Sequence, residues 1–477
     1  MYFNSFAFCF FLITVFILHW FVFNKSKTNQ NLLLILVSYF FYSFWNWHFL
    51  FLLVFSTLLD FYSAIQIENA SSVKIKKFWF WSSIGINLGF LGVFKYFNFF
   101  VASFTEMLLH FGFKCNPLLL DIMLPVGISF YTFHGLSYVI DIYNGRIKAE
   151  KNFIDYSIFV CYFPLLVAGP IERATHLLPQ VKFKREFDYH LAKEGVYQIV
   201  WGFVKKVVIA DSCATYANAI FDHYEQMNSL SLILGAVYFS FQIYGDFSGY
   251  SDIALGVSKL FGIRLLKNFD FPYFSRDIAE FWRRWHMSLS SWFRDYLYIP
   301  LGGSVGGKWM QIKNTFIIFL VSGFWHGANW TFIVWGGLNA LYFLPLLLLQ
   351  KNRKNIGEIT ITNFQNGFHT ISNIFITFIL TSFAWIFFRA QSLHQAFGYI
   401  ERMFTNHHFS LQFLKNQRQN HEILILIIAF IMVEWFNKYK IEPISGKYEQ
   451  LKLVLFLVTI IMFGVFTDYK NFIYFQF

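Results

Sequence analysis

The sequence predicts an all-α, polytopic membrane protein with about ten spanning helices, re-entrant segments and an interfacial amphipathic helix. Of the 477 residues, 56% are hydrophobic and only 14% are charged, whereas soluble domains carry about 25% charged residues. Long apolar runs recur along the chain, and short basic loops separate many of them. Because no long polar stretch interrupts this pattern, we expect residues 1–477 to form a single membrane domain.

Ten apolar runs are the candidates for spanning helices. They fall at about 5–23, 31–47, 49–66, 78–100, 118–140, 195–220, 231–262, 371–389, 422–437 and 451–467. No small-residue cleavage site follows the first run, so we expect it to be retained rather than removed as a signal peptide.

Basic loops predict the orientation, because Lys and Arg mark the cytoplasmic side. They follow the first, third and fifth runs and precede the last, at Lys25, Lys27, Lys74, Lys76, Lys77, Arg146, Lys148, Lys151, Lys438, Lys440 and Lys447. This pattern places both termini outside, and it accounts for the net charge of +11 without a nucleic-acid partner. The four cysteines are scattered without CxxC spacing, so we expect neither a disulfide framework nor a metal site.

Two further apolar segments are predicted to be re-entrant. Residues 155–171 lie between basic loops, and residues 315–349 contain no Asp, Glu, Lys or Arg. As one helix the second segment would be roughly 50 Å long, against a hydrocarbon core of about 30 Å. We therefore expect it to enter and return, with the break close to His326. Irregular backbone at membrane depth must be buried in protein or line a cavity.

His326 is the first candidate functional residue, because a titratable group in an apolar membrane segment is costly and indicates function. Gly323 and Gly327 flank it and allow another backbone or a substrate to come close. The alternative is a packed histidine that is hydrogen-bonded to a neighbouring helix.

Residues 276–298 mix charged and aromatic side chains at helical spacing, which predicts an amphipathic helix at the cytoplasmic interface. In one interpretation its arginines reach toward lipid phosphates. In the other, Arg283, Arg284 and Trp285 form a basic floor for an anionic cytosolic donor, and His286 faces inward.

Asp246 and Asp252 lie inside the 231–262 run and need partners or water at membrane depth. Either they pair with Lys205, Lys206 or an arginine, or they orient a catalytic group.

Taken in order, these segments resemble the membrane-bound O-acyltransferase family, and above all its bacterial branch of alginate and peptidoglycan O-acetyltransferases. The resemblance covers nearly the whole chain and rests on Leu124-Pro125-Val126-Gly127-Ile128-Ser129-Phe130-Tyr131-Thr132-Phe133, Ala168-Gly169-Pro170-Ile171-Glu172-Arg173, the Asp246 block, Trp285-His286 and Trp325-His326-Gly327. It implies that His326 is the essential intramembrane histidine and that His286 is a second active-site histidine on the cytoplasmic side. It also implies a thioester donor and a funnel through the bilayer where donor and acceptor meet.

Acyl transfer from a thioester to a hydroxyl needs a base for the hydroxyl proton and a donor for the tetrahedral oxyanion. Histidine, with an ordinary pKa of about 6.5, suits the first role. Asn329 or Trp325 is the candidate N–H donor, and Asp246 a supporting residue.

The C-terminal tail, residues 472–477, holds a third candidate, Tyr474. It is either an aromatic-belt residue at the outer interface or an acyl carrier. The tail is similar to the C-terminal motif of the small membrane protein that carries D-alanine in teichoic acid modification. A phenol, with a pKa of about 10, is a better leaving group than an aliphatic alcohol, so an acyl-Tyr474 would be suited to pass its group onward.

The function expected from these residues is transfer of an acyl group, most simply acetyl from acetyl-CoA, across a bacterial cytoplasmic membrane to an envelope polysaccharide. We place peptidoglycan first and an alginate-like exopolysaccharide second. A periplasmic or membrane-anchored polysaccharide O-acetyltransferase subunit is the expected partner within the lipid bilayer, and no metal is expected. The alternatives are D-alanyl transfer to teichoic acid from an acylated carrier protein, a transporter or channel, and a structural scaffold.

Overall fold

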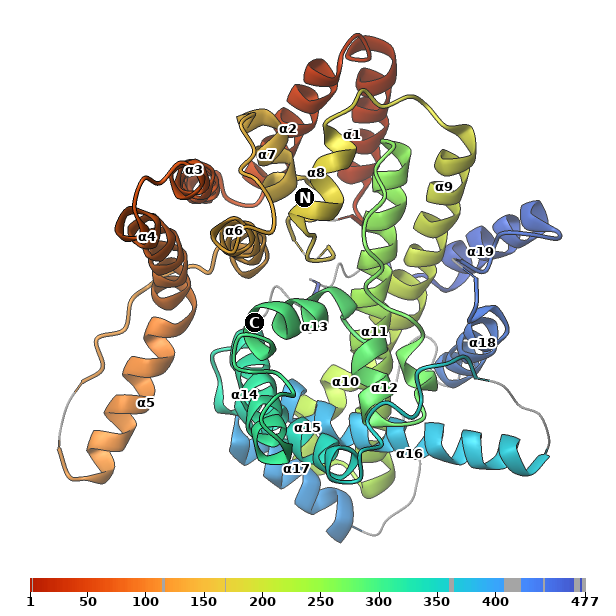
Figure 1. Cartoon of the computed structure of the whole chain (residues 1–477). Helices are drawn as coiled ribbons and strands as arrows, with labels where there is room; N and C mark the ends of the chain where they lie inside the picture. The colour runs from red at the N-terminus through yellow and green to blue at the C-terminus, as the bar shows by residue number, and fades with distance from the viewer. Residues whose placement is uncertain are drawn as a thin grey trace. The chain divides into compact units, whose positions relative to one another are not determined.

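The computed structural model describes residues 1, 3–113, 116–167, 169–359, 364–406, 422–440, 442–466 and 472–473. Tyr474, Ala168 and Cys115 lie outside the described residues. Within the described part all regular secondary structure is helical, turns and irregular segments connect the helices, and there is no strand (Figure 1). The all-α prediction is therefore confirmed. The chain divides into two compact units: residues 1–195 with 254–266, and residues 196–253 with 267–477. The single domain stays a prediction.

The first unit is built from the N-terminal helices. They are α1 (Phe6–Ile17), η1 (Leu18–Val22), α2 (Lys27–Ser43), α3 (His48–Glu68), α4 (Val73–Leu91), η2 (Gly92–Tyr96), α5 (Phe97–His110), α6 (Ile128–Tyr143), α7 (Phe153–Cys161) and α8 (Ala174–Val181). The beginning of α9 (Tyr189–Phe203) and the end of α11 (Ser229–Leu260) complete it.

The second unit takes the rest of α9 and α11 together with the C-terminal helices. These are η3 (Val204–Ala210), α10 (Asp211–Asp222), η4 (Tyr224–Gln226), η5 (Pro272–Phe274), α12 (Ile278–Arg284), α13 (Met287–Phe293), η6 (Arg294–Tyr298), α14 (Lys308–His326), α15 (Trp330–Leu348), α16 (Phe364–Arg389), α17 (Leu393–Thr405), α18 (Glu422–Asn437) and α19 (Glu449–Phe463).

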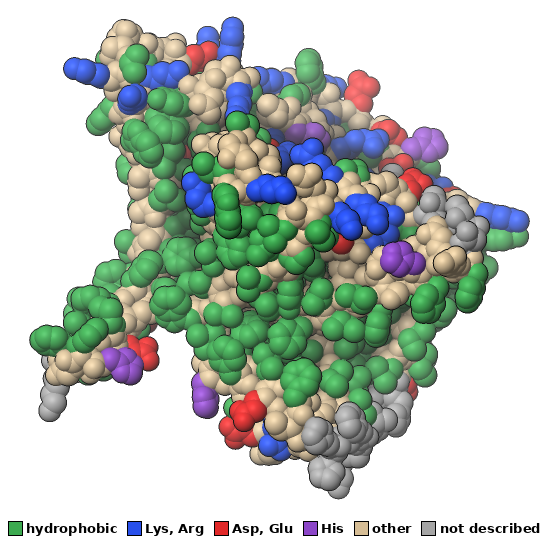
Figure 2. Space-filling view, turned by 60° about the horizontal axis from the view of Figure 1, so that its bottom comes forward, with side chains coloured by type: hydrophobic (Ala, Val, Ile, Leu, Met, Phe, Trp, Pro, Cys, Tyr) green, Lys and Arg blue, Asp and Glu red, His purple; other side chains and the backbone are tan. Residues whose placement is uncertain are grey.

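Five helical stretches among the described residues are long and apolar enough to cross a membrane. They are His48–Glu68, Val73–His110, Ser229–Leu260, Trp330–Leu348 and Phe364–Arg389. Hydrophobic side chains gather over a broad area of the face drawn in Figure 2. On α16, Phe364, Phe368 and Phe375 are 91%, 70% and 62% exposed. An exposed apolar stripe of this kind suits contact with lipid rather than water. A multi-pass membrane protein is confirmed, whereas the number of ten spans stays a prediction.

The predicted break near His326 is confirmed. Helix α14 ends at His326, Asn329 caps the N-terminus of α15 by accepting a hydrogen bond from the Thr331 N–H, and the two helices lie side by side (Figure 1). Each has 19 residues and is therefore about 28 Å long. A side chain at Gly323 would collide with the carbonyl of Phe332, which explains why α14 and α15 can pack so closely.

Two other predicted segments differ from the structure. The run at 118–140 becomes helical only at Ile128, after Pro125 and after Gly127 at φ +73°, because left-handed backbone interrupts a helix. The single amphipathic helix predicted for 276–298 is wrong: the segment is divided into α12, α13 and η6, with a sharp turn at His286.

The re-entrant segment predicted at 155–171 contains only the short helix α7, whose nine residues are about 14 Å long and cannot cross a bilayer alone. Turns follow it. Residues 155–161 are all buried, including Tyr156 and Phe159 at 0% exposure. A short helix followed by irregular, buried backbone is the arrangement that such a segment requires.

Candidate active site

His326 ends α14 inside an aromatic enclosure. Its side chain is buried, at 4% exposure. The edges of three rings surround the imidazole, with centroid distances of 4.9 Å to Trp325, 5.1 Å to Trp335 of α15 and 5.3 Å to Phe388 of α16. Because three elements contribute these rings, packing fixes the plane of the imidazole.

His286 lies between α12 and α13 in the left-handed region, with φ 45° and ψ 54°. Few residues other than glycine adopt this conformation, and such strain is often found at functional sites. The His286 side chain is 1% exposed. The turn is held by Asn268, whose backbone carbonyl accepts a hydrogen bond from the Met287 N–H at 2.9 Å.

The side chain of Asn268 also fixes the tautomer of His286. Its Oδ1 accepts hydrogen bonds from the backbone N–H and the hydroxyl of Ser288. It lies 3.0 Å from His286 Nδ1. A backbone N–H can only donate, so Oδ1 is the acceptor and His286 Nδ1 carries the proton. In the neutral ring the lone pair is therefore on Nε2, which has no hydrogen-bond partner among the described residues.

Burial lowers the pKa of His286 to about 3, because desolvation disfavours the imidazolium. The ring is therefore neutral near pH 7, with Nε2 able to accept a proton. A general base must be neutral and oriented, as this ring is, but it is most effective when its pKa lies near the operating pH, so a pKa this low makes His286 a weak base.

The structure brings the two predicted histidines around one tryptophan. The Trp325 ring is 6.1 Å from His286 and 4.9 Å from His326, measured between centroids. Trp325 is itself 5% exposed. His286, Trp325 and His326, all in the second unit, form what we call the histidine cluster.

The predicted pairing of the α11 carboxylates is confirmed. Lys206 Nζ lies 2.6 Å from Asp246 and 2.9 Å from Asp211. Lys205 Nζ lies 2.7 Å from Asp252. Phe247, the residue after Asp246, links the Lys206–Asp246 ion pair to the histidine cluster. Its ring packs edge-to-face with His286, at 4.6 Å between centroids.

The described part of the C-terminal tail, Phe472 and Ile473, contacts Asp246 and Phe247. The Ile473 N–H donates a hydrogen bond of 2.7 Å to Asp246 Oδ2. The Phe472 ring lies 5.9 Å from that of Phe247. Tyr474 itself is outside the described residues, so its role as an acyl carrier stays a prediction.

The predicted donor-binding residues are engaged within the protein. Arg283 donates to the backbone carbonyls of Asn352 and Asn355, each at 2.9 Å. Arg284 donates to Glu280 at 2.8 Å. Trp285 is 1% exposed inside an aromatic core. Arg283 thus connects α12 with the 352–355 loop, Arg284 bonds within α12, and a role in donor binding stays a prediction.

The two candidate oxyanion donors are placed differently. Trp325 belongs to the histidine cluster. Asn329 caps α15 through its carbonyl oxygen, and its amide donates to the Gln391 carbonyl at 2.8 Å. One amide hydrogen of Asn329 is thus already used, and the oxyanion role of either residue stays a prediction.

Sequence reasoning missed the residues that orient the histidines. Asn268 is 18 positions before His286, and no spacing rule connects them. Trp335 and Phe388 belong to apolar helices and look like ordinary core residues. The signal in the sequence was the run of aromatic residues near the end of α16, Trp385, Phe387 and Phe388. In the structure Trp385 stacks on Trp335 at 5.5 Å.

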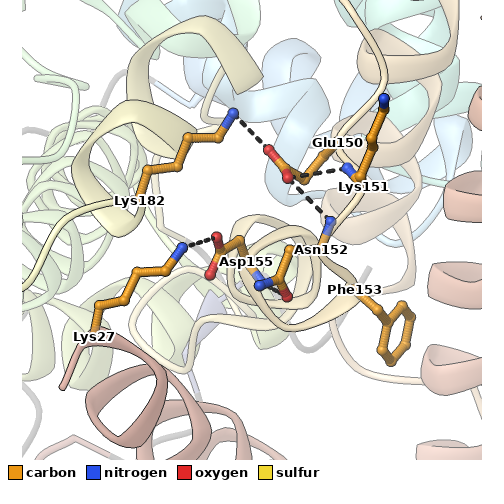
Figure 3. Close-up of a pocket in the computed structure, with 7 residues that line it drawn as sticks. All are labelled: Lys27, Glu150, Lys151, Asn152, Phe153, Asp155 and Lys182. Carbon is orange, nitrogen blue, oxygen red and sulfur yellow. Dashed lines mark hydrogen bonds and ion pairs between the residues drawn. The ribbon is translucent and has the colours of Figure 1, made fainter.

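The first unit contains a separate polar hollow of about 660 Å³ (Figure 3). Two ion pairs border it, Lys27 with Asp155 at 2.8 Å and Lys182 with Glu150 at 2.6 Å. Burial alone would raise the pKa of Glu150, but Lys182 and two backbone N–H groups lower it. The carboxylates thus connect α2, α7 and α8, and the hollow contains none of the predicted catalytic residues.

Comparison with known proteins identifies the family. A family model described as MBOAT, membrane-bound O-acyltransferase family, matches residues 146–390. The chain is 35% identical to the probable alginate O-acetylase AlgI of Pseudomonas putida, over 88% of this chain and 89% of that protein. It is 34% identical to the peptidoglycan O-acetyltransferase of Helicobacter pylori, over 74% and 69%.

A teichoic acid D-alanyltransferase of Bacillus subtilis is 30% identical over 56% of this chain and 69% of its own length. The matched region, residues 146–390, contains both histidines of the cluster and the Asp246 block. The chain therefore belongs to the membrane-bound O-acyltransferase family and is a multi-pass membrane O-acyltransferase.

Proposed function

We propose that the protein transfers acetyl groups from cytosolic acetyl-CoA across the bacterial cytoplasmic membrane for O-acetylation of an envelope polysaccharide. The observation that carries this proposal is the histidine cluster, in which His286 presents an unpartnered Nε2 beside Trp325 and His326. Relatives named for alginate and for peptidoglycan match at similar identity, 35% and 34%. Peptidoglycan is the first acceptor to test and an alginate-like exopolysaccharide the second.

In the first step a hydroxyl attacks the thioester carbonyl. A histidine of the cluster takes the hydroxyl proton as the new C–O bond forms, and the C–S bond then breaks. The departing thiolate recovers that proton from the imidazolium, so CoA leaves as the thiol. His326 is our candidate for this base, and His286 assists at the donor side.

The acceptor in that step is proposed to be Tyr474. The support is the described beginning of the tail, which is fixed at Ile473 to Asp246 and packs at Phe472 against the neighbour of His286. The aryl ester then transfers its acetyl group to a hydroxyl of a partner subunit or of the polysaccharide, and the phenol of Tyr474 is restored. The partner we expect is a periplasmic or membrane-anchored O-acetyltransferase.

This function requires a path for the donor from the inner face and for the acceptor from the outer face. We propose that about ten spans form a funnel around the histidine cluster, with both termini outside. Labelling of a single cysteine at position 4 or 477, in a variant without the four native cysteines, tests that orientation. The reagent is membrane-impermeant and is applied to intact cells and to inverted vesicles. Labelling in inverted vesicles alone would contradict it.

The carrier step is tested by peptide mass spectrometry of the purified protein after incubation with acetyl-CoA. We expect a 42 Da adduct, the mass that acetylation adds to any hydroxyl, on Tyr474 of the wild type. The adduct is absent from His326→Gln and Tyr474→Phe, and retained in the matched control Tyr469→Phe. Acetyl-CoA turnover that needs His326 but gives no adduct would remove the carrier and keep the acetyltransferase. Turnover only with an aminoacylated carrier protein would favour D-alanyl transfer.

A further inference from the structure

Asp246 divides its two carboxylate oxygens between an ion pair and the C-terminal tail. Oδ1 lies 2.6 Å from Lys206 Nζ, and Oδ2 accepts the Ile473 N–H at 2.7 Å. Lys206 is in turn held by Asp211 at 2.9 Å. All three charged side chains are buried, at 3%, 7% and 2% exposure. Charges this deeply buried are costly unless each has partners, so the tail completes the environment of Asp246.

The backbone of η3 lies close to α11 and to the residues that precede the tail. Lys206 lies in the π-helix η3, where the chain departs from α-helical geometry, as it often does at functional sites. A Cβ atom at Gly245 would lie 2.8 Å from the Lys205 carbonyl, so glycine allows η3 to approach α11. The carbonyl of Val207, in the same π-helix, accepts a hydrogen bond from the Val465 N–H at 3.0 Å.

The two described side chains of the tail are buried as well. Phe472 is 4% exposed and Ile473 is 2% exposed. The Phe472 ring lies 4.9 Å from Tyr250 and 5.9 Å from Phe247. Phe247 then meets His286 at 4.6 Å. The tail residues directly before Tyr474 are therefore one ring away from the histidine cluster.

We propose that Asp246, held by Lys206 and Asp211, is a positioning residue that docks the C-terminal tail beside the histidine cluster. The docking stands on the contacts of Phe472 and Ile473. Its purpose, to present Tyr474 for acylation, rests on the proposed function. The carboxylate thus acts on the reaction through the tail backbone, without contact with the reacting atoms.

Asp252 offers a matched control on the same helix. It also forms an ion pair, with Lys205 at 2.7 Å, in which the lysine is buried and the carboxylate is partly buried, and it accepts a hydrogen bond from Gln198 at 3.0 Å. Removal of either carboxylate takes one of two acidic partners from a buried lysine, because Lys206 keeps Asp211 and Lys205 keeps Glu434. Of the two carboxylates, Asp246 is the one that accepts a hydrogen bond from the described tail.

The test is hydrogen–deuterium exchange of the full-length protein in nanodiscs, read at the Ile473 amide. A hydrogen bond to a charged group is lost in Asp246→Ala, so we expect exchange to become about tenfold faster or more. Asp246→Asn keeps an acceptor oxygen and is expected to restore part of the protection. Asp252→Ala is expected to leave the Ile473 amide unchanged. Unaltered protection of α14 and α15 shows that each variant is folded.

A second variant, Phe472→Ala, removes the ring contact without touching any charge and is also expected to speed this exchange. In acetylation assays Asp246→Ala is expected to lower the rate of Tyr474 acetylation and to leave the KM for acetyl-CoA unchanged. Wild-type exchange rates at Ile473 in both Asp246→Ala and Phe472→Ala would overturn the docking proposal. Faster exchange in a protein whose wild type never acetylates Tyr474 would support docking and contradict the carrier function instead.

Discussion

The two histidines of the cluster are both buried, but different forces orient them. A hydrogen bond from His286 Nδ1 to Asn268 and a left-handed backbone fix His286. The edges of Trp335 and Phe388 fix His326 from two other helices. A hydrogen bond selects one tautomer as well as one orientation, whereas ring packing selects mainly an orientation. We therefore expect His286 to be the more sensitive to loss of a polar neighbour and His326 to changes in the shape of its neighbours.

The largest effect is expected from replacement of His326. His326→Gln keeps a polar side chain but removes the base, so the acetyl transfer rate is expected to fall by about 10²–10⁴-fold. The rate is measured with purified protein and acetyl-CoA. The matched control is His369→Gln, since His369 is exposed on α16. A loss below tenfold would leave His326 as a packed core residue.

The next largest effect is expected from substitutions at Asn268, which change the hydrogen bond that orients His286 but not the rings around His326. Asn268→Ala leaves Nδ1 without its acceptor and is expected to lower the transfer rate by about tenfold or more. Asn268→Asp places a carboxylate beside the ring, which raises the pKa of His286. The imidazole is then protonated at a higher pH, and the acid limb of the pH–rate profile moves upward. Identical profiles for Asn268→Asp and wild type would separate His286 from the chemistry.

Sequence alone anticipated the elements whose cause is local. The length of 315–349 and its glycines predicted the break at His326, and the cost of buried carboxylates predicted partners for Asp246 and Asp252. The turn at His286 was missed, because Asn268 stabilises it from outside the segment. The enclosure of His326 was missed for a similar reason: Phe388 comes from a helix 62 positions later, and an apolar residue carries no signal of its neighbours.

A smaller effect is expected on the pH dependence of the protein's stability, through the lowered pKa of His286. The pKa of His286 is lowered to about 3 by burial, while the unfolded chain titrates at about 6.5. The unfolded state therefore binds the proton first, so this residue costs stability as the pH falls from about 6.5 toward 3. We expect the wild type to lose thermal stability over this range and His286→Gln to lose less. Parallel curves for the two proteins would contradict a buried, neutral His286.

The smallest effect is expected at the rings around His326. Phe388→Leu keeps an apolar side chain, so it is expected to cost about 1 kcal/mol of stability. It loosens the imidazole and is expected to lower the transfer rate by less than about tenfold. Thermal unfolding and the acetyl-CoA assay measure both. The same substitution at Phe375, an exposed residue of α16, is the control and is expected to change neither.

A double-mutant cycle tests most directly whether His286 and His326 of the histidine cluster work as one site. Transfer rates are compared for wild type, His286→Gln, His326→Gln and the double variant. Residues that act together lose their effect together, so the account predicts a double variant no slower than the slower single variant. Losses that multiply would show that the two histidines act independently, and would contradict the account.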